Sequence, residues 1–186
     1  PHKFFENHYL CPRKVRATLI APKPFPSPVS FILYSTTIYM STLQPGNTLQ
    51  NGKYEIQRVL GQGGFGVTYL ALQQGLNRIV AIKEFFMENF CVRNADTHHV
   101  TITTEGSREF VERYRNKFLK EARNIAKLEH PNIVSIIDVF EENSTAYYVM
   151  KYAQNGSLDD KVKREGHLSE AEATRYILKV AKALRF

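Results

Sequence analysis

Apolar and polar residues follow a strand-like pattern on both sides of a glycine-rich stretch. Residues 54–60 alternate loosely between the two kinds and lead into the glycines. Residues 67–72 and 79–83 are rich in β-branched, aromatic and other apolar side chains. The pattern therefore predicts three strands, the first two joined by a glycine turn.

A second period, of three to four residues, predicts a helix over 107–129 with one apolar face. This face is formed by Val111, Tyr114, Phe118, Ala122, Ile125 and Leu128. Glu121 flanks the face. It is either a surface carboxylate that pairs with Lys117, or a charge beside the core that needs a more distant partner.

The remaining pattern predicts two more strands, over 133–140 and 146–150, and two further helices. Ser157 begins a capping-box sequence that opens a short helix ending near Gly166. The last helix opens at 169–172 and carries four apolar side chains on one face: Tyr176, Ile177, Val180 and Leu184. We expect that face to reduce solubility if nothing covers it.

The connection over 84–106 is unusually long, and connections of this length are usually functional or mobile. Val100 and Ile102 alternate with polar residues and suit a short hairpin strand. His98 and His99 are adjacent, so their side chains would diverge on a strand, and a solvated loop is the better interpretation than a metal site.

Residues 1–39 differ from the rest. They include four alternating prolines, which favour extended chain, and the apolar run over 29–40 is too short to cross a bilayer. We expect 1–39 to be a disordered extension outside the domain, 40–52 a polar leader, and the folded lobe to start near Lys53. The prolines also interrupt any signal-peptide pattern.

The charge distribution and the cysteine content argue against nucleic-acid binding, a disulfide framework and a zinc site. The 186 residues are 43% hydrophobic and carry a formal net charge of +7. Residues 1–39 hold five basic residues and one acidic residue, hence four of those charges, and no basic stripe with interleaved aromatics indicates nucleic-acid binding. Cys11 and Cys91 lie far apart, so neither a disulfide framework nor a zinc site is expected.

The glycines carry the clearest chemical signal. Gly61, Gly63 and Gly66 form G-x-G-x-x-G, a pattern that can serve phosphates, a sheet bend or no chemistry. A dinucleotide-binding fold needs a helix after the glycines, whereas a strand is predicted here. Lys83 ends the apolar strand over 79–83 and either lies beside the turn or extends to the surface.

These segments resemble the eukaryotic-type protein kinase family, and GGFGVTYLA with AIKEFF resembles its bacterial serine/threonine members. Residues 130–134 (HPNIV) and 147–158 (YYVMKYAQNGSL) strengthen the resemblance. Thr68 stands where the family pattern has Val, and Lys151 where it often has Glu. The implied fold is α+β, with a small lobe over 53–153 (a five-stranded antiparallel sheet and one main helix) and a truncated large lobe over 154–186.

The resemblance also implies roles for individual residues. Lys83 and Glu121 would form the catalytic pair, Met150 would be the gatekeeper beside the adenine, and 151–153 the hinge. The implied ATP-binding residues are Leu60, Gly61, Gly63, Gly64, Phe65, Gly66, Thr68, Ala81, Lys83, Met150, Lys151, Tyr152 and Ala153. No metal ligand is implied within the chain, because the family's catalytic and Mg²⁺-binding motifs would follow Phe186.

The expected function is therefore the ATP-binding lobe of a cytoplasmic serine/threonine protein kinase. Its partners would be ATP, Mg²⁺ and a protein substrate, with neither nucleic acid nor a membrane segment. The 186 residues alone should be inactive in phosphate transfer. A pseudokinase or nucleotide-regulated scaffold is the alternative, a small-molecule kinase of related fold stays open, and a Rossmann-type dehydrogenase is disfavoured.

Overall fold

A computed structural model of the chain describes residues 39–185, with side chains from residue 41 onward. Most of the predicted extension over 1–39 lies outside these residues. The strands are β1 (Tyr39–Met40), β2 (Thr48–Leu49), β3 (Tyr54–Gly63), β4 (Gly66–Gln73), β5 (Arg78–Phe85), β6 (Cys91–Asn94), β7 (Val100–Ile102), β8 (Ile136–Glu142) and β9 (Thr145–Lys151). The α-helices are α1 (Arg108–Ile125), α2 (Leu158–Glu165) and α3 (Glu170–Arg185).

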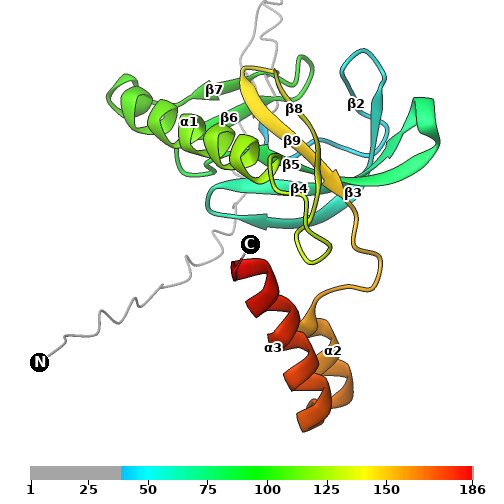
Figure 1. The fold of residues 1–186 in the computed structure, drawn as a ribbon. Helices are drawn as coiled ribbons and strands as arrows, with labels where there is room; N and C mark the ends of the chain where they lie inside the picture. The colour runs from blue at the N-terminus through cyan, green and yellow to red at the C-terminus, as the bar shows by residue number, and fades with distance from the viewer. Residues whose placement is uncertain (1–38, 186) are drawn as a thin grey trace, which may run out of the picture. The chain divides into compact units, whose positions relative to one another are not determined.

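The main sheet is antiparallel, with strand order β2-β3-β4-β5-β9-β8 (Figure 1). All five predicted strands are present, and the two-residue β2 adds a sixth. β3 runs further than predicted because Gly63 pairs with Gly66 across the turn. β8 starts later than predicted because the N–H of Ile133 donates to the carbonyl of His130, 3.0 Å away, in a turn.

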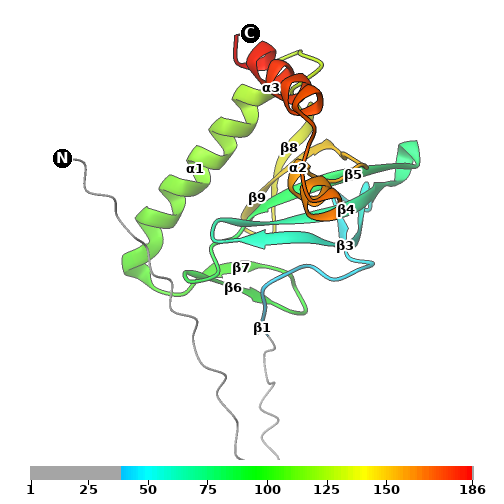
Figure 2. The ribbon, with the colours of Figure 1, turned by 90° about the horizontal axis from the view of Figure 1, so that it is seen from below.

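The helix α1 lies along the sheet and packs against β8 and β9 (Figure 2). Its buried side chains include Val111, Phe118 and Ala122, which confirms this part of the predicted apolar face. Leu128, predicted on the same face, lies beyond the helix and is 40% exposed. The helix ends at Ile125 rather than at 129. Beyond it, the N–H of Leu128 donates to the carbonyl of Ile125 at 2.9 Å, a turn too tight to continue an α-helix.

The stretch interpreted as a polar leader contributes to the core. Leu43 and Leu49 are 1% and 0% exposed. The N–H of Leu43 also donates to the hydroxyl of Tyr69 at 3.1 Å. Polar neighbours hid these two positions in the sequence, and the strand β2 that contains Leu49 is only two residues long.

The long connection over 84–106 folds into a β-hairpin. β6 pairs with β7 and with β1 to form a separate antiparallel sheet, so the predicted strand at Val100 and Ile102 is present. The N–H of Val100 donates to the carbonyl of Asn143 at 2.8 Å. Nδ1 of His99 lies 2.9 Å from the hydroxyl of Ser144, so the hairpin is held to the β8–β9 turn.

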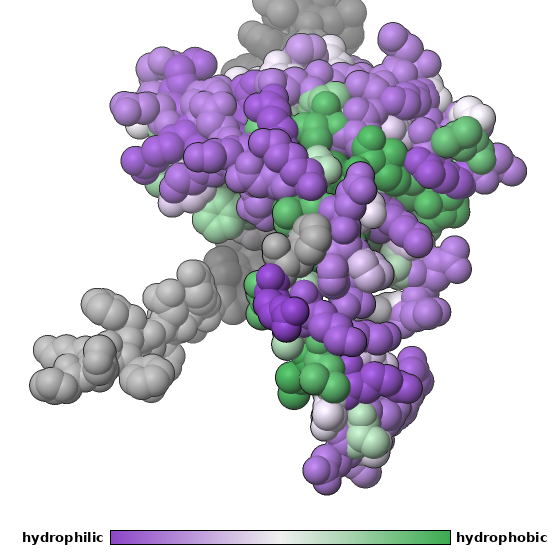
Figure 3. Space-filling model, viewed as in Figure 1, coloured by the Kyte–Doolittle hydropathy of each residue, from purple (hydrophilic) through white to green (hydrophobic). Residues whose placement is uncertain are grey.

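The last two helices follow the predicted pattern. Ser157 and Asp160 form the capping box of α2, and Gly166 ends that helix at a φ of 82°. On α3, Ile177 and Leu184 are 67% and 83% exposed. Figure 3 shows apolar surface in the region of α2 and α3. Within residues 39–185, no helix has the length and apolar character required to cross a membrane.

Candidate functional site

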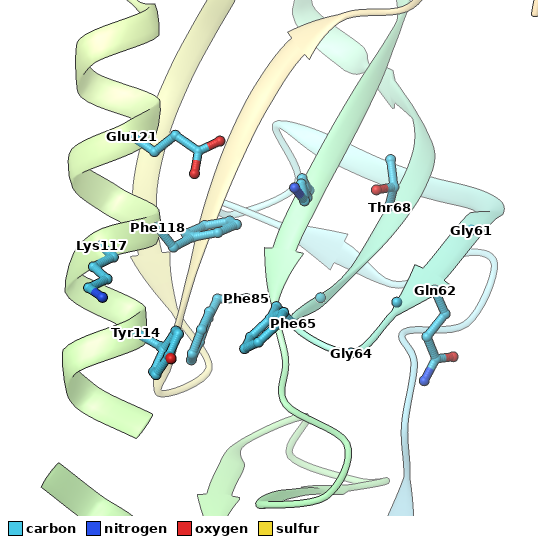
Figure 4. Close-up of a pocket in the computed structure, with 13 residues that line it drawn as sticks. Gly61, Gln62, Gly64, Phe65, Thr68, Phe85, Tyr114, Lys117, Phe118 and Glu121 are labelled. Carbon is cyan, nitrogen blue, oxygen red and sulfur yellow. The ribbon is translucent and has the colours of Figure 1, made fainter. Parts of the chain in front are cut away.

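A cavity of about 680 Å³ opens between the glycine turn and α1 (Figure 4). It is lined by residues of β3, β4, β5, α1 and the glycine turn. Its lining consists of Gly61, Gln62, Gly63, Gly64, Phe65, Gly66, Thr68, Lys83, Phe85, Tyr114, Lys117, Phe118 and Glu121. Eight of these are predicted site residues: Gly61, Gly63, Gly64, Phe65, Gly66, Thr68, Lys83 and Glu121.

The glycine turn is a β-hairpin, with strand β4 after it where a dinucleotide-binding fold would have a helix. A Cβ atom added at Gly61, Gly63 or Gly64 would meet no atom within 4 Å. A Cβ at Gly66 would lie 2.3 Å from the backbone carbonyl oxygen of Glu84. Gly66 thus allows β4 to approach β5, while the other glycines leave an uncovered backbone beside the cavity.

Lys83 lies on β5 opposite Thr68 on β4 and Tyr148 on β9. Directly opposite residues in an antiparallel ladder share one face of the sheet. Lys83 is half-buried, and its Nζ lies 5.7 Å from the centroid of the Tyr148 ring. Its ammonium is therefore held at the cavity and does not extend into bulk solvent.

Glu121 comes from α1, is exposed, and points toward the strands in Figure 4. It lines the same cavity as Lys83. Among the ion pairs of residues 39–185, none joins these two side chains. The structure thus brings the predicted pair to one site but not into contact.

The remaining predicted residues lie elsewhere. Leu60, Ala81 and Met150 do not line the cavity; Ala81 is buried in the sheet between Leu70 and Met150. Residues 151–153 line a second cavity of about 300 Å³, which they share with residues of the loop before β8.

Phe65 is a predicted site residue, but three further aromatic side chains of the lining, Phe85, Tyr114 and Phe118, were not predicted to belong to the site. The rings of Phe65, at the tip of the glycine turn, and Tyr114 stack with centroids 5.3 Å apart and planes at 19°. Nζ of Lys117 lies 5.0 Å from the centroid of the Tyr114 ring. Tyr114 had been assigned to the apolar helix face, and periodicity alone cannot separate a side chain in a core from one in a cavity wall.

A buried polar cluster lies on the other face of β5. The Glu84 carboxylate is 0% exposed and accepts hydrogen bonds from the hydroxyls of Tyr69 and Tyr147, each at 2.6 Å. Arg93 of β6, 1% exposed, donates to the same carboxylate at 2.5 Å. Burial, followed by the negative charge of Glu84, raises the pKa of both tyrosines. No local pattern in the sequence had indicated this cluster.

The described residues do not fit a metal ion. Between residues 39 and 185, no three His, Cys, Asp or Glu side chains are grouped as metal ligands would be.

Comparisons with known proteins agree with this geometry. The family described as the protein kinase domain matches residues 54–186. The chain is 34% identical over 147 residues to the serine/threonine-protein kinase PksC of Streptomyces coelicolor, covering 75% of this chain and 23% of PksC. It is also 34% identical over 134 residues to the serine/threonine-protein kinase PrkC of Bacillus subtilis, covering 72% of this chain and 18% of PrkC.

A solved structure, "PpkA-294 apo form", superposes with a TM-score of 0.68 at 29% identity, and the match covers 73% of this chain and 48% of that one. The predicted α+β fold and the resemblance to bacterial serine/threonine kinases are thereby confirmed. The chain spans about a quarter or less of the two curated relatives' length. From its sequence pattern, its fold and these matches, the chain belongs to the protein kinase family.

Proposed function

We propose that this chain is the ATP-binding part of a cytoplasmic serine/threonine protein kinase, which transfers the γ-phosphate of ATP to hydroxyl groups of a protein substrate. The observation that carries the proposal is the single cavity shared by the glycine turn, Lys83 and Glu121. Family membership supports the reaction class.

The residues of the cavity suit the phosphates of a nucleotide. Backbone N–H groups of the turn can approach phosphate oxygens because Gly61, Gly63 and Gly64 carry no side chains. The Lys83 ammonium supplies a positive charge on the opposite wall. We assign the α- and β-phosphates to Lys83. To Glu121 we assign the orientation of Lys83, which requires the two side chains to come together when nucleotide binds.

The adenine would extend from Thr68, which lines the cavity, to residues outside the cavity. We assign contacts with its faces to Leu60, Thr68, Ala81 and Met150, and hydrogen bonds with its edge to the backbone of 151–153. ATP supplies the phosphoryl group, and the chain's own residues bind and orient it. We also propose that these 186 residues bind ATP without transferring its phosphate, since the sequence contains neither H-R-D nor D-F-G.

Calorimetric titration of the 186-residue protein with ATP tests the binding proposal. Replacing Lys83 with Met should weaken binding by roughly tenfold or more, because hydrogen bonds to charged groups contribute about 1.5–3 kcal/mol. Lys163→Met removes an ammonium that is 73% exposed on α2 and serves as the matched control. Equal affinity of wild type and Lys83→Met would contradict the assignment. Time-dependent phosphate transfer by the isolated chain would contradict the proposed lack of activity.

A further inference from the structure

The connection over 84–106 reaches the candidate site through one side chain. Along β5, Lys83 and Phe85 face the cavity, and Glu84 between them faces the opposite side of the sheet. There its carboxylate meets Arg93 from β6, at the start of the inserted hairpin. The hairpin is thus joined to the strand that carries the pocket lysine, one residue away from that lysine.

The three hydrogen-bond donors to the Glu84 carboxylate come from three different strands. Oε2 accepts from Tyr69 of β4, and Oε1 accepts from Tyr147 of β9 and from Arg93. Arg93 is held in turn by the carbonyl of His98, 2.8 Å away, and lies over the Phe86 ring with its Cζ 5.4 Å from the centroid. Glu84 therefore ties β5 to both neighbouring strands and to the hairpin.

The same residues touch the glycine turn through the backbone. The carbonyl of Glu84 packs against Gly66, and the N–H of Phe86 donates to the carbonyl of Phe65 at 3.3 Å. A displacement of the end of β5 would move Lys83 and the turn together. A buried ion pair of this kind is costly to form and costly to break, so it holds one arrangement of the strand.

We propose that Arg93 and Glu84 are positioning residues for Lys83, with the β6–β7 hairpin fixing the end of β5 from the face opposite the cavity. The proposal rests on the proposed function in one respect only, namely that Lys83 contacts the nucleotide. Neither residue touches that nucleotide. Both act through the backbone of residues 83–86.

Amide hydrogen exchange of the 186-residue protein tests this without any ligand. Replacing Arg93 with Met should accelerate exchange at residues 83–86 by at least about tenfold more than at β3 and α1, because the opening is local. Arg93→Lys, which keeps a cation beside Glu84, should recover most of the protection. The control is Arg108→Met, which breaks an exposed pair with Glu105 and should leave the exchange pattern unchanged.

Titration of the same variants with ATP measures whether the ion pair also affects nucleotide binding. Arg93→Met should bind ATP roughly tenfold more weakly, with Arg93→Lys close to wild type, because small misplacements of a supporting group are costly. Failure of wild type to bind ATP would count against the proposed function and leave the exchange result to decide the positioning role. Uniform acceleration of exchange across the fold would overturn the positioning role.

Should Arg93→Met fail to fold, Tyr69→Phe provides a milder variant. It removes one hydrogen bond to Glu84 and the acceptor of the Leu43 N–H, and it leaves the charge of Glu84 paired. It should show the same selective acceleration at 83–86, with a smaller factor. Exchange at 83–86 that rises no more than elsewhere would overturn the proposal in this variant too.

Discussion

Gly66 is the glycine of the turn at which a larger side chain would collide with the backbone. Its neighbours Gly61, Gly63 and Gly64 face open space, whereas Gly66 faces the backbone of β5. The glycine motif therefore combines two physical requirements. Three positions leave the backbone uncovered, and one allows two strands to approach.

Replacing Gly66 with Ala should lower the free energy of unfolding by about 1–3 kcal/mol, because the new methyl group would overlap a backbone oxygen that cannot move freely. Gly64→Ala, at the same turn but with no atom near its Cβ, should change stability by less than about 0.5 kcal/mol. Urea unfolding followed by circular dichroism measures both. Equal effects of the two substitutions would show that β4 does not approach the Glu84 carbonyl closely at Gly66.

Asp138 offers a test by pH. It accepts hydrogen bonds from Lys53 at 2.7 Å and Tyr54 at 3.0 Å. Burial alone would raise the pKa of Asp138, but these hydrogen bonds outweigh it and hold the pKa below its ordinary 3.8. A lowered pKa in the folded state stabilises the protein above the unfolded value, and this stabilisation is lost as the pH falls through the folded value.

The difference in unfolding free energy between wild type and Asp138→Asn should therefore stay constant above about pH 5 and shrink as the pH falls below 3.8. We expect roughly 1 kcal/mol at neutral pH, since the carboxylate is partly exposed and screened by solvent. Urea titrations at a series of pH values measure this difference. A difference that grows as the pH falls below 3.8 would contradict the assignment.

At the scale of elements, the glycine hairpin and α1 meet through the stacked rings of Phe65 and Tyr114. Tyr114 also packs against Phe110, with centroids 4.7 Å apart, and Phe110 against Phe90 of the connection after β5, at 5.4 Å. This row of rings links the tip of the turn to the helix that carries Glu121. The position of α1 and the closure of the turn should therefore depend on each other.

Tyr114→Ala should release the tip of the turn, because a stacked aromatic pair contributes about 0.5–1.5 kcal/mol. The expected readout is roughly fivefold faster exchange of the Phe86 amide, which donates to Phe65, relative to the Val149 amide in the middle of β9. Tyr114→Phe keeps the ring and is the matched control. Equal acceleration at Phe86 and Val149 would mean that the stack does not hold the turn.

The elements also show where prediction from sequence succeeds. The five strands and α1 were predicted because β-branched runs and a regular apolar period are local signals. The Lys83–Glu121 pair was expected from a resemblance, and the structure brings the two residues to one cavity without joining them. The cluster around Glu84 could not be predicted, because its members are spread over residues 69–147 and only the fold brings them together.

At the scale of the whole chain, the described residues bury a core on the sheet and leave α3 with an apolar face. Ile177, Leu178, Val180 and Leu184 are each more than half exposed. Contiguous apolar surface of this kind favours association with other molecules. The same face is the reason why low solubility is expected from the sequence.

Replacing Ile177 and Leu184 together with Lys should reduce self-association of the 186-residue protein, because two exposed apolar side chains on α3 become charged. Sedimentation velocity at increasing protein concentration measures this. The control is Thr174→Lys, which adds charge at an exposed polar position of the same helix. An unchanged association state in the double variant, or an equal change in the control, would contradict the role of this face.

The buried pair of Arg93 and Glu84 has a consequence for how related sequences can diverge. Losing one partner alone leaves the other as an uncompensated buried charge. This lowers the free energy of unfolding by about 3–5 kcal/mol. That is a large share of the 5–15 kcal/mol by which domains are typically stable. The two positions should thus change together in evolution. A related sequence with an apolar residue at one position should also have an uncharged residue at the other.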